Sequence, residues 1–544
     1  MPNQNGGGSV QLSTRLSRSA SVALAAVVIS SVSLTGCLSG GGGSSSGSAA
    51  QWPEPTDLSS TLSGDVRGVE QEGYFEFLGI PYAAAPIGDL RFAAPQAVAG
   101  WDEERAADAY GSACPQAGMT SDEAEDCLYL NVFTPKTRGP HPVMVWFHGG
   151  AFVFGSGGGT YIPPRLVAED VVVVTVNYRL GKLGFTAHPG LTAEQGASGS
   201  YGIMDQQLAL QWVQDNIKAF GGDNDNVTIF GESAGGLSVL SHLVSPASAG
   251  LFAKAIVQSG SYSTVQASMA TAEGEGESFA ALLGCDAATA AEEVECLRSK
   301  KVADILAIAP GTVIPTLRPD VLPVSVNAGL ATGEYNDVPL LMGTNADEWS
   351  YFLASRGELN PITQFNYQFL LNASVGVEQT PTVVGLYPAA EFNDDYAAVM
   401  TAIGTDGRFA CNASVQAASV AATGTQPLFV YEFADRAAPS PGIVAPSWLT
   451  LGATHASELS YLFGTDDFFR VRGATDDQVA LAGIMSRAWA AFARSGNPSH
   501  DDLSWVDYGD SAGGMVSFET PAVRPLSRSV FRDLHRCDYW TPEV

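Results

Sequence analysis

Two nearly continuous apolar runs, at residues 142–147 and 171–176, stand out in the first half of the chain. Runs without polar alternation are typical of strands buried on both faces, as in a parallel sheet that is covered by helices. Shorter or partly alternating segments of the same kind lie before and after them. Together the pattern predicts strands at residues 73–80, 128–133, 142–147, 171–176, 227–230, 339–342 and 427–433.

Segments with helical spacing separate these strands. Residues 204–220 repeat apolar positions at intervals of three and four, and a second helix is expected from Ala234 onward. Strands that alternate with helices predict an α/β fold, with a central, mostly parallel sheet flanked by helices. Residues 265–335 and 355–425 are expected to form mostly helical insertions in this fold.

The charge of the chain limits its partners. The 544 residues carry 57 acidic and 27 basic side chains, a net charge of −30 with an isoelectric point near 4.4. Such a surface repels the phosphates of nucleic acids, so nucleic acid is excluded as a partner. A chain of this length can bury a large core without help from a metal.

The N-terminus has the pattern of an export signal. Basic residues precede an apolar run at 20–32, which is too short to cross a bilayer, and the sequence Leu-Thr-Gly then leads to Cys37. This arrangement resembles the lipobox of bacterial lipoproteins, which implies cleavage after residues 1–36 and attachment of lipid to Cys37. Residues 37–55 include a Gly/Ser-rich stretch that is typical of a flexible tether.

These features predict a protein exported to the cell envelope and held there by its lipid anchor. Leu38 stands where a retention signal would place Asp, and we expect the outer membrane or cell surface rather than the inner membrane. The alternative is an ordinary secretory signal in which Cys37 occurs by chance.

Six further cysteines follow the export signal. An even number in an exported chain indicates disulfides, although six cysteines allow fifteen pairings. Short loops favour Cys114–Cys127 and Cys285–Cys296, which leaves Cys411–Cys537. Cysteine and histidine are nowhere clustered at metal-ligand spacing, so we expect no metal and no cofactor.

The strongest chemical signal is the G-x-S-x-G sequence around Ser233, between a predicted strand and a predicted helix. A serine hydroxyl is a poor nucleophile unless a base takes its proton. A sharp strand-to-helix turn exposes the hydroxyl, and flanking glycines relieve the crowding. Ser233 is therefore the candidate nucleophile.

A loop of small residues after the strand at 142–147 suits an oxyanion hole, because backbone N–H groups can approach a substrate there. The expected donors are the N–H groups of Gly150 and Ala151, with that of Ala234 after the nucleophile. His148 lies in this loop and is interpreted as stabilising it rather than acting as a base.

The base is expected near the C-terminal end, at His455, within a stretch of small residues. The chain order nucleophile, acid, histidine requires an acid between these two residues. Glu348 follows the strand at 339–342, where catalytic side chains collect in such sheets, and Asp347 is its competitor. A carboxylate there would fix the tautomer of the imidazole and stabilise its charged form. Ser259 could hydrogen-bond near the acid or be an ordinary buried serine.

At this point the chain resembles the type B carboxylesterases, a family that includes bacterial carboxylesterases, fungal lipases and cholinesterases. The resemblance covers residues 56–544 and implies an α/β-hydrolase fold that acts on small-molecule esters. It implies the triad and the oxyanion donors named above, and the same three disulfides. Its markers are Glu125–Asn131, His148–Phe152, Asn177–Leu180, Phe220–Asp223, Gly231–Gly236, Asp347–Glu348 and His455–Leu459.

Three departures from the family pattern refine the expected substrate. Ala151 and Trp349 stand where family members often have Gly, and the segment between Cys114 and Cys127 has no aromatic residue. A quaternary ammonium group needs an aromatic ring, so choline esters are not the expected substrate. The loop ending at Ala151 resembles that of members that accept bulky tertiary-alcohol esters.

The sequence therefore predicts a serine carboxylesterase. An interfacial lipase or polyester hydrolase is the alternative among enzymes, and an amide or xenobiotic ester hydrolase is also open. A non-catalytic adhesion protein on the same fold would be expected to lack part of the triad. Acyl-chain preference and oligomeric state do not follow from the sequence.

Overall fold

The computed structural model describes residues 52–117, 123–357, 360–510 and 514–542. The expected signal peptide, Cys37 and most of the tether lie outside these residues. Residues 52–544 form one compact unit, which holds every hydrophobic cluster and disulfide described below, so this part is expected to fold without the N-terminal segment. Among the described residues, no helix is both long and apolar enough to cross a membrane.

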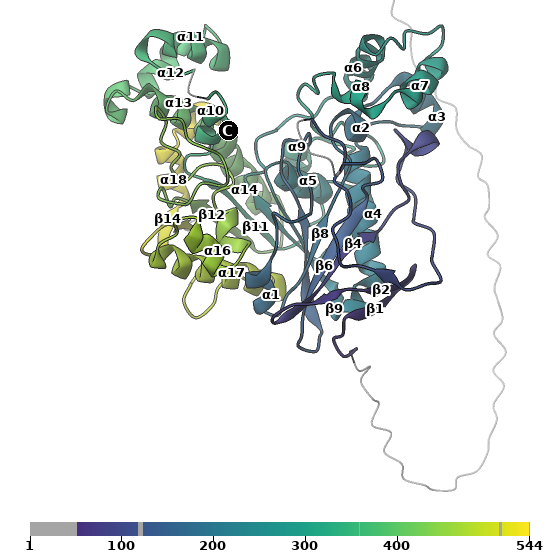
Figure 1. The fold of residues 1–544 in the computed structure, drawn as a ribbon. Helices are drawn as coiled ribbons and strands as arrows, with labels where there is room; N and C mark the ends of the chain where they lie inside the picture. Colours follow the sequence, from purple (N-terminus) through teal and green to yellow (C-terminus); the bar gives the residue numbers. More distant parts are fainter. Residues whose placement is uncertain (1–51, 118–122, 358–359, 511–513, 543–544) are drawn as a thin grey trace, which may run out of the picture. The chain divides into compact units, whose positions relative to one another are not determined.

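A large mixed sheet forms the centre of this unit (Figure 1). Its strands lie in the order β14-β13-β12-β11-β10-β9-β7-β8-β6-β4-β3, and those from β13 to β8 run parallel. The strands are β3 (Val69–Glu70), β4 (Tyr74–Pro81), β6 (Tyr129–Pro135), β7 (His141–Phe147), β8 (Val172–Val176), β9 (Gly222–Glu232), β10 (Lys254–Gln258), β11 (Leu340–Asn345), β12 (Leu428–Phe433), β13 (Gly514–Phe518) and β14 (Arg524–Ser527). A small second sheet contains β1 (Leu58–Thr61), β2 (Gly64–Arg67) and β5 (Arg105–Ala106).

All seven predicted strands are present, and the sheet is wider than the sequence indicated. The predicted strand at 227–230 is only the centre of β9, which has 11 residues. Four strands of this sheet were not predicted: β10 in the centre of the sheet, whose apolar run is only three residues long, β13 beside one edge, and the edge strands β3 and β14. The edge strands were missed because β3 has two residues and β14 is partly exposed and contains a proline. Edge strands need no continuous apolar run, since one side of them lacks a neighbour.

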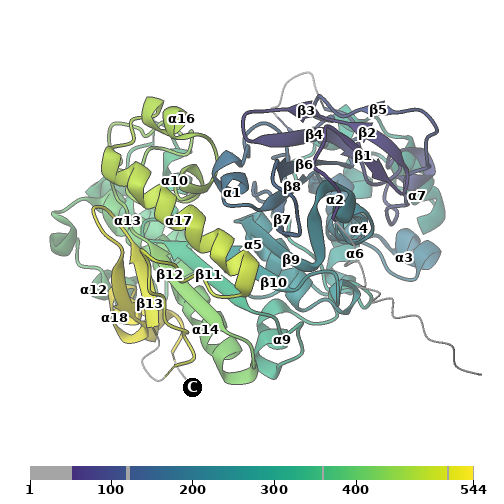
Figure 2. The same ribbon diagram turned by 90° about the horizontal axis from the view of Figure 1, so that it is seen from below.

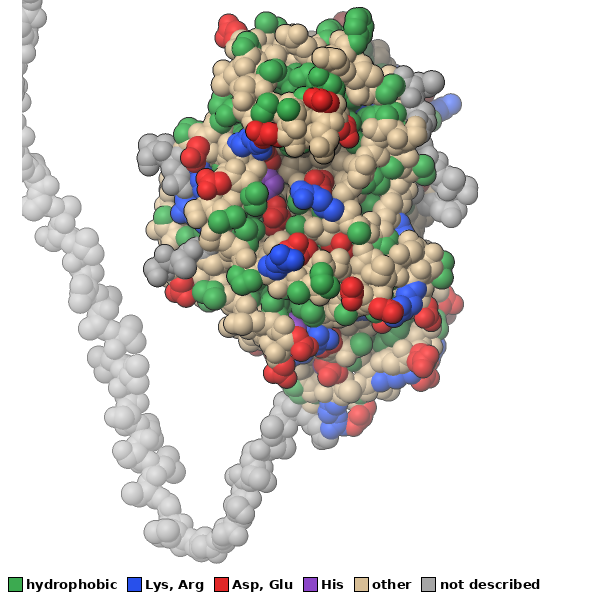
Figure 3. Space-filling view, turned by 90° about the vertical axis from the view of Figure 1, so that its left-hand side faces the viewer, with side chains coloured by type: hydrophobic (Ala, Val, Ile, Leu, Met, Phe, Trp, Pro, Cys, Tyr) green, Lys and Arg blue, Asp and Glu red, His purple; other side chains and the backbone are tan. Residues whose placement is uncertain are grey.

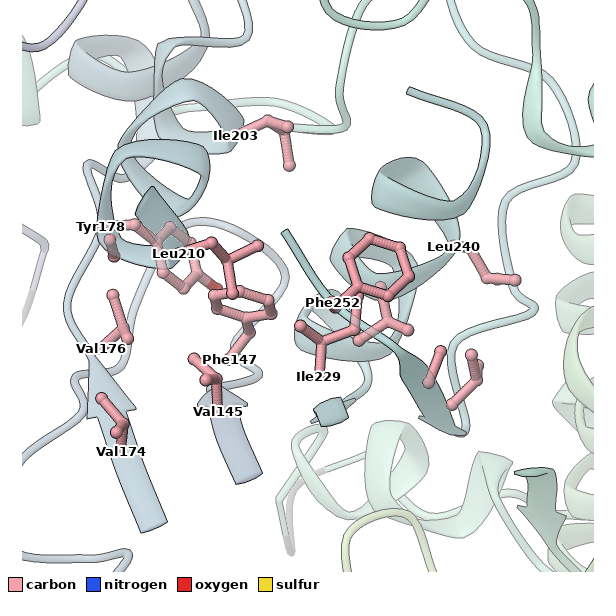
Figure 4. Close-up of a cluster of buried hydrophobic side chains, with 14 of the residues drawn as sticks. Val145, Phe147, Val174, Val176, Tyr178, Ile203, Leu210, Ile229, Leu240 and Phe252 are labelled. Carbon is pink, nitrogen blue, oxygen red and sulfur yellow. The ribbon is translucent and has the colours of Figure 1, made fainter. Parts of the chain in front are cut away.

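Helices cover both faces of the sheet because successive side chains of each strand point to opposite sides. Val145 and Phe147 of β7 pack into one hydrophobic cluster with α4 (Tyr201–Asn216) and α5 (Ala234–Leu243), whereas Met144 and Trp146 pack into another with α17 (Asp476–Ser495). Figure 4 shows side chains of the first cluster, in which Leu210 of α4 and Leu240 of α5 share one face of the sheet with Val145, Phe147 and Ile229. Figure 2 shows α17 running along the opposite face.

The helices follow the alternation that the sequence predicted. The predicted helix at 204–220 is α4 followed by a 3-10 turn (Ile217–Phe220). The helices around the sheet are α1 (Pro164–Ala168), α2 (Gly181–Phe185), α3 (Pro189–Gln195), α4 (Tyr201–Asn216), α5 (Ala234–Leu243), α10 (Trp349–Ala354), α15 (Leu459–Leu462), α16 (Asp466–Val471), α17 (Asp476–Ser495), α18 (Arg528–Leu534) and α19 (Cys537–Trp540).

Both predicted insertions are mostly helical. The first supplies α6 (Met269–Leu282), α7 (Ala290–Ser299), α8 (Val302–Leu306) and α9 (Val326–Thr332). The second supplies α11 (Gln364–Val375), α12 (Thr380–Leu386), α13 (Tyr396–Thr405), a π-helical turn (Asp406–Ala410) and α14 (Cys411–Thr423). The second insertion has its own hydrophobic cluster, which also includes residues of α10.

A buried ion cluster ties the C-terminal segment to the second insertion. His535 places its Nδ1 atom 2.6 Å from Asp406 Oδ1 and its Nε2 atom 2.7 Å from Glu432 Oε1. Burial lowers the pKa of His535, but the two carboxylates outweigh this effect and raise the pKa to about 10. The imidazole is therefore charged at neutral pH.

Candidate active site

Ser233 occupies the sharp turn between β9 and α5. Its φ of 56° and ψ of −117° lie outside the regions that residues with side chains favour, a strain of about 1–3 kcal/mol. Close packing holds this turn, because a Cβ atom on Gly235 would lie 1.8 Å from the carbonyl oxygen of Phe147. The Ser233 N–H also donates to the carbonyl of Gln258 in β10, at 2.9 Å. The expected nucleophile therefore stands at the carboxyl ends of the central strands.

His455 and Glu348 are in direct contact. His455 lies in the loop between β12 and α15, and its Nδ1 atom faces the Oε2 atom of Glu348. Glu348 follows β11 and is completely buried. Its other oxygen, Oε1, accepts hydrogen bonds from the Thr344 hydroxyl and the Asn345 N–H, both at 2.8 Å. The structure thus brings the predicted acid and base together.

The environment keeps Glu348 ionised. Burial alone would raise its pKa, but the charge of His455 and several hydrogen bonds favour the carboxylate, so the pKa lies below its usual value. Ser259 contributes to this lowering, although its buried hydroxyl makes no hydrogen bond of good geometry in the described chain. Ser259 therefore lies beside the acid, as one of its two interpretations expected.

The second ring nitrogen of His455 faces a different glutamate. Its Nε2 atom lies 3.0 Å from Oε1 of Glu232, the residue before the nucleophile. Within the described residues, no hydrogen bond joins Ser233 to His455. Catalytic hydrogen bonds are often long in unliganded enzymes and shorten when substrate binds.

Glu232 is one of two site residues that the sequence reasoning missed. It is buried and lies beside the nucleophile, and burial raises its pKa. The pKa of His455 is raised as well, because the charges of Glu232 and Glu348 outweigh the effect of its burial. The only sequence signal was the position of Glu232 inside the G-x-S-x-G motif.

A third glutamate, Glu458, completes the buried acidic cluster. Its two oxygens accept hydrogen bonds from the side-chain amides of Gln258, at 3.1 Å, and Asn345, at 2.7 Å. Burial raises its pKa. Glu458 belongs to the His455–Leu459 motif, but the motif alone assigned it no role.

The predicted donor loop lies against the nucleophile. A Cβ atom on Gly149 would stand 2.6 Å from Oε2 of Glu232 and 3.2 Å from Cβ of Ser233. Gly150 and Ala151 both have positive φ, at 105° and 54°, and their N–H groups make no hydrogen bond within the part of the chain that the structure describes.

Ala234 is the first residue of α5, and the first N–H groups of a helix have no partner inside it. The three N–H groups expected to bind an oxyanion therefore come from two segments that flank Ser233.

His148 and Asp347, the alternative candidates for the base and the acid, have structural roles instead. His148 is buried, stacks on Tyr178 at 4.3 Å, and pairs through Nδ1 with the carbonyl of Gly149 at 2.8 Å. Burial lowers its pKa to about 4. Asp347 instead accepts hydrogen bonds from Arg436 and the Ala453 N–H, both at 2.9 Å, so it anchors the loop before His455.

Aromatic side chains surround the base. The rings of Tyr351 and Phe352 from α10, and of Phe409 from the π-helical turn, lie 5.8, 5.2 and 5.2 Å from the His455 ring. Trp349, where family members often have Gly, packs on α13 so closely that a Cβ atom on Gly404 would lie 2.0 Å from it. A glycine in α13 thus accommodates this departure.

The six cysteines pair as expected, as Cys114–Cys127, Cys285–Cys296 and Cys411–Cys537. The last pair joins residues that are 126 positions apart in the chain. In the part of the chain that the structure describes, acidic, histidine and cysteine side chains form no group suited to hold a metal ion.

A serine on a strained strand-to-helix turn, a buried Glu–His pair and this order of parallel strands define a serine hydrolase of the α/β-hydrolase fold. The model of the carboxylesterase family matches residues 56–540. The chain belongs to this family and is a carboxylic-ester hydrolase.

Relatives and solved structures agree with this assignment. The chain is 36% identical to para-nitrobenzyl esterase of Bacillus subtilis over 471 residues, which cover 82% of this chain and 92% of that protein. It is 36% identical to acylcarnitine hydrolase of Mus musculus over 489 residues, 83% of this chain and 86% of the other. A solved PNB esterase matches 88% of this chain and 99% of its own, with 33% identity and a TM-score of 0.74.

Proposed function

We propose that Ser233 is the nucleophile of this esterase, His455 its general base and Glu348 the acid that orients the base. The observation that carries this proposal is the contact between His455 Nδ1 and the fully buried Glu348, beside a serine on a strand-to-helix turn. A carboxylate on Nδ1 leaves Nε2 as the nitrogen that can accept a proton.

In the proposed mechanism, Ser233 attacks the ester carbonyl while His455 takes its proton. The carbonyl oxygen becomes an oxyanion that the N–H groups of Gly150, Ala151 and Ala234 stabilise. His455 then returns the proton to the departing alcohol and leaves an acyl-enzyme. Water hydrolyses the acyl-enzyme by the same route, which releases the acid.

The proposed substrates are neutral carboxylic esters. The aromatic rings around His455 offer an apolar surface, and the segment between Cys114 and Cys127 lacks an aromatic residue that would bind a quaternary ammonium group. The relatives named above include a para-nitrobenzyl esterase and an acylcarnitine hydrolase, and a substrate of the first class fits these features better. Acceptance of tertiary-alcohol esters is proposed from the loop at Ala151. Hydrolysis of tert-butyl acetate tests it, and absence of turnover refutes it.

The test of the triad uses a chain that begins at Trp52, with p-nitrophenyl esters from acetate to palmitate. We expect Ser233→Ala to abolish turnover, whereas Ser259→Ala retains most of it. Preference for short acyl chains supports the carboxylesterase proposal, and preference for long chains supports a lipase. Turnover that persists in Ser233→Ala would contradict the assignment of the nucleophile.

We further propose that the mature protein is a lipoprotein of the cell envelope, anchored through Cys37. The support is the Leu-Thr-Gly-Cys sequence after a short apolar run and before a Gly/Ser-rich tether. Metabolic labelling with a radioactive fatty acid should mark the full chain and leave Cys37→Ser unlabelled. Equal labelling of both chains, or of neither, would refute lipid attachment at this residue.

A further inference from the structure

Helix α11 is apolar on two opposite faces. Tyr367 and Leu371 point inward and pack in the hydrophobic cluster of the second insertion. Phe365 and Phe369, four residues apart on the other side, are 98% and 73% exposed. Large apolar side chains that are exposed next to one another often mark an interaction site, so the outer face of α11 is expected to have a partner.

The segment that follows α11 extends this exposed apolar surface. Val377, just after α11, is 72% exposed, and Val384 of α12 is 40% exposed. Between residues 360 and 390 only Glu378 is charged, although the whole chain carries a net charge of −30. Figure 3 shows hydrophobic side chains over the top of the molecule, where α11 and α12 lie in Figure 1.

The size of this surface argues against a second copy as its partner. An aromatic side chain spans about 150–250 Å², so the two phenylalanines present roughly 300 Å² of apolar surface. A stable protein interface buries about 800 Å² on each partner. Two projecting rings with few charges around them fit insertion into the interface of a lipid layer better, because such insertion needs only a small apolar surface.

The surface is also connected to the active site. Helix α10 begins directly after Glu348 and places Tyr351 and Phe352 beside His455. Leu353 and Ala354 of the same helix lie in the hydrophobic cluster that supports α11. A lipid layer bound by α11 would therefore lie close to α10, the helix that places aromatic side chains in the active site.

We propose that the exposed face of α11, centred on Phe365 and Phe369, docks the enzyme on a neutral lipid surface. The rings enter the headgroup region, and the low local charge avoids repulsion there. Anionic lipid is disfavoured, because the remainder of the chain is strongly acidic. Docking is a second function of the molecule and does not require the esterase proposal to hold.

The first test measures partition of the chain from Trp52 onto phosphatidylcholine vesicles by flotation. Transfer of one buried aromatic side chain changes a partition constant by about tenfold or more, so F365S/F369S should bind at least tenfold more weakly. The matched control V265S/L282S changes two residues that are also exposed, at 74% and 68%, but lie outside α11 and α12. It should bind as the wild type does.

Three results would overturn the proposal: no binding of the wild type, equal loss in both double variants, or binding only to vesicles of phosphatidylglycerol. A fourth is a solution mass of the wild type twice that of F365S/F369S, which would assign the face to a second copy. Hydrolysis of p-nitrophenyl acetate should be the same in all chains, so failure of docking is distinguishable from failure of the active site.

A second variant tests docking without removing the rings. Phe365→Trp adds a fluorophore at the most exposed position of the face. The difference spectrum between this variant and the wild type should shift to shorter wavelength when phosphatidylcholine vesicles are added. An unchanged spectrum at vesicle concentrations that bind the wild type would overturn the proposed orientation.

Discussion

Replacing Glu232 by Gln should shift the acidic limb of the pH–rate profile to lower pH. His455 acts as a base only when it is neutral, and its pKa is raised above the ordinary value of 6.5. The carboxylate of Glu232, 3.0 Å from Nε2, is one cause of this increase. Glutamine keeps the shape of the side chain and removes the charge, so the pKa of His455 should fall and the neutral base should appear at lower pH.

The magnitude follows from the distance and from the protonation of Glu232. Two full charges 3.0 Å apart attract by about 5 kcal/mol at an effective dielectric constant of about 20. Burial raises the pKa of Glu232 to about 8, close to the value of about 9 for His455, so the two groups titrate together and only part of this attraction appears in the limb. Because 1.36 kcal/mol corresponds to one pKa unit, we expect the limb to move by about 1–2 pH units.

The assay is kcat/KM for p-nitrophenyl acetate from pH 5 to pH 10. Asp347→Asn is the control, because it removes an adjacent carboxylate that contacts Arg436 rather than His455. The control should leave the limb in place, whatever its effect on the rate. A limb in Glu232→Gln that stays fixed or moves to higher pH would refute the coupling between Glu232 and the base.

Three further changes test other parts of the structure. Gly149→Ala should lower kcat by at least about tenfold with a smaller effect on KM, because the added Cβ atom would crowd Ser233. An unchanged kcat would refute the tight packing of Gly149 against the nucleophile. Glu348→Gln should lower kcat by about 10³–10⁴-fold, because the tautomer of the base is no longer fixed; a loss below tenfold would remove Glu348 from the triad. His535→Gln leaves Asp406 and Glu432 without their buried cation and should cost about 3–5 kcal/mol of unfolding free energy. Because the pKa of His535 is raised, the loss of unfolding free energy should be complete below pH 6.5 and should disappear as the pH rises through about 10. Urea denaturation of the variant and the wild type at several pH values measures it. A loss that does not depend on pH would contradict a charged His535.

Most of the central strands could be predicted because they are buried on both faces, although β10 was missed because only three consecutive apolar residues lie between Lys254 and Gln258. Continuous apolar runs mark β7 and β8 without ambiguity, and the serine motif marks the end of β9. The edges could not be predicted in this way. Strand β14 has an exposed arginine and a proline, and its place in the sheet depends on pairing with β13 rather than on its own composition.

The catalytic triad could be proposed from motifs, whereas the electrostatics of the site could not. Nothing local distinguishes Glu232 or Glu458 from a surface glutamate, because their burial results from how distant segments pack. Trp349 is a similar case. As a departure from the family pattern it had no explanation until the structure placed Gly404 against it.

The three buried glutamates around His455 show how the fold assigns different roles to the same side chain. Glu348 accepts hydrogen bonds from a hydroxyl and a backbone N–H and contacts the imidazole, so it stays ionised despite its burial. Glu232 and Glu458 have fewer compensating interactions, and burial raises the pKa of both. Environments that separate the pKa values of neighbouring acids in this way are how active sites assign distinct roles. The pKa of Glu232, about 8, lies below that of His455, about 9, so both Glu348 and Glu232 are charged at the pH where the imidazole loses its proton. Both carboxylates then favour the protonated imidazole, and this is why the charge of Glu232 helps to set the pH at which the enzyme becomes active.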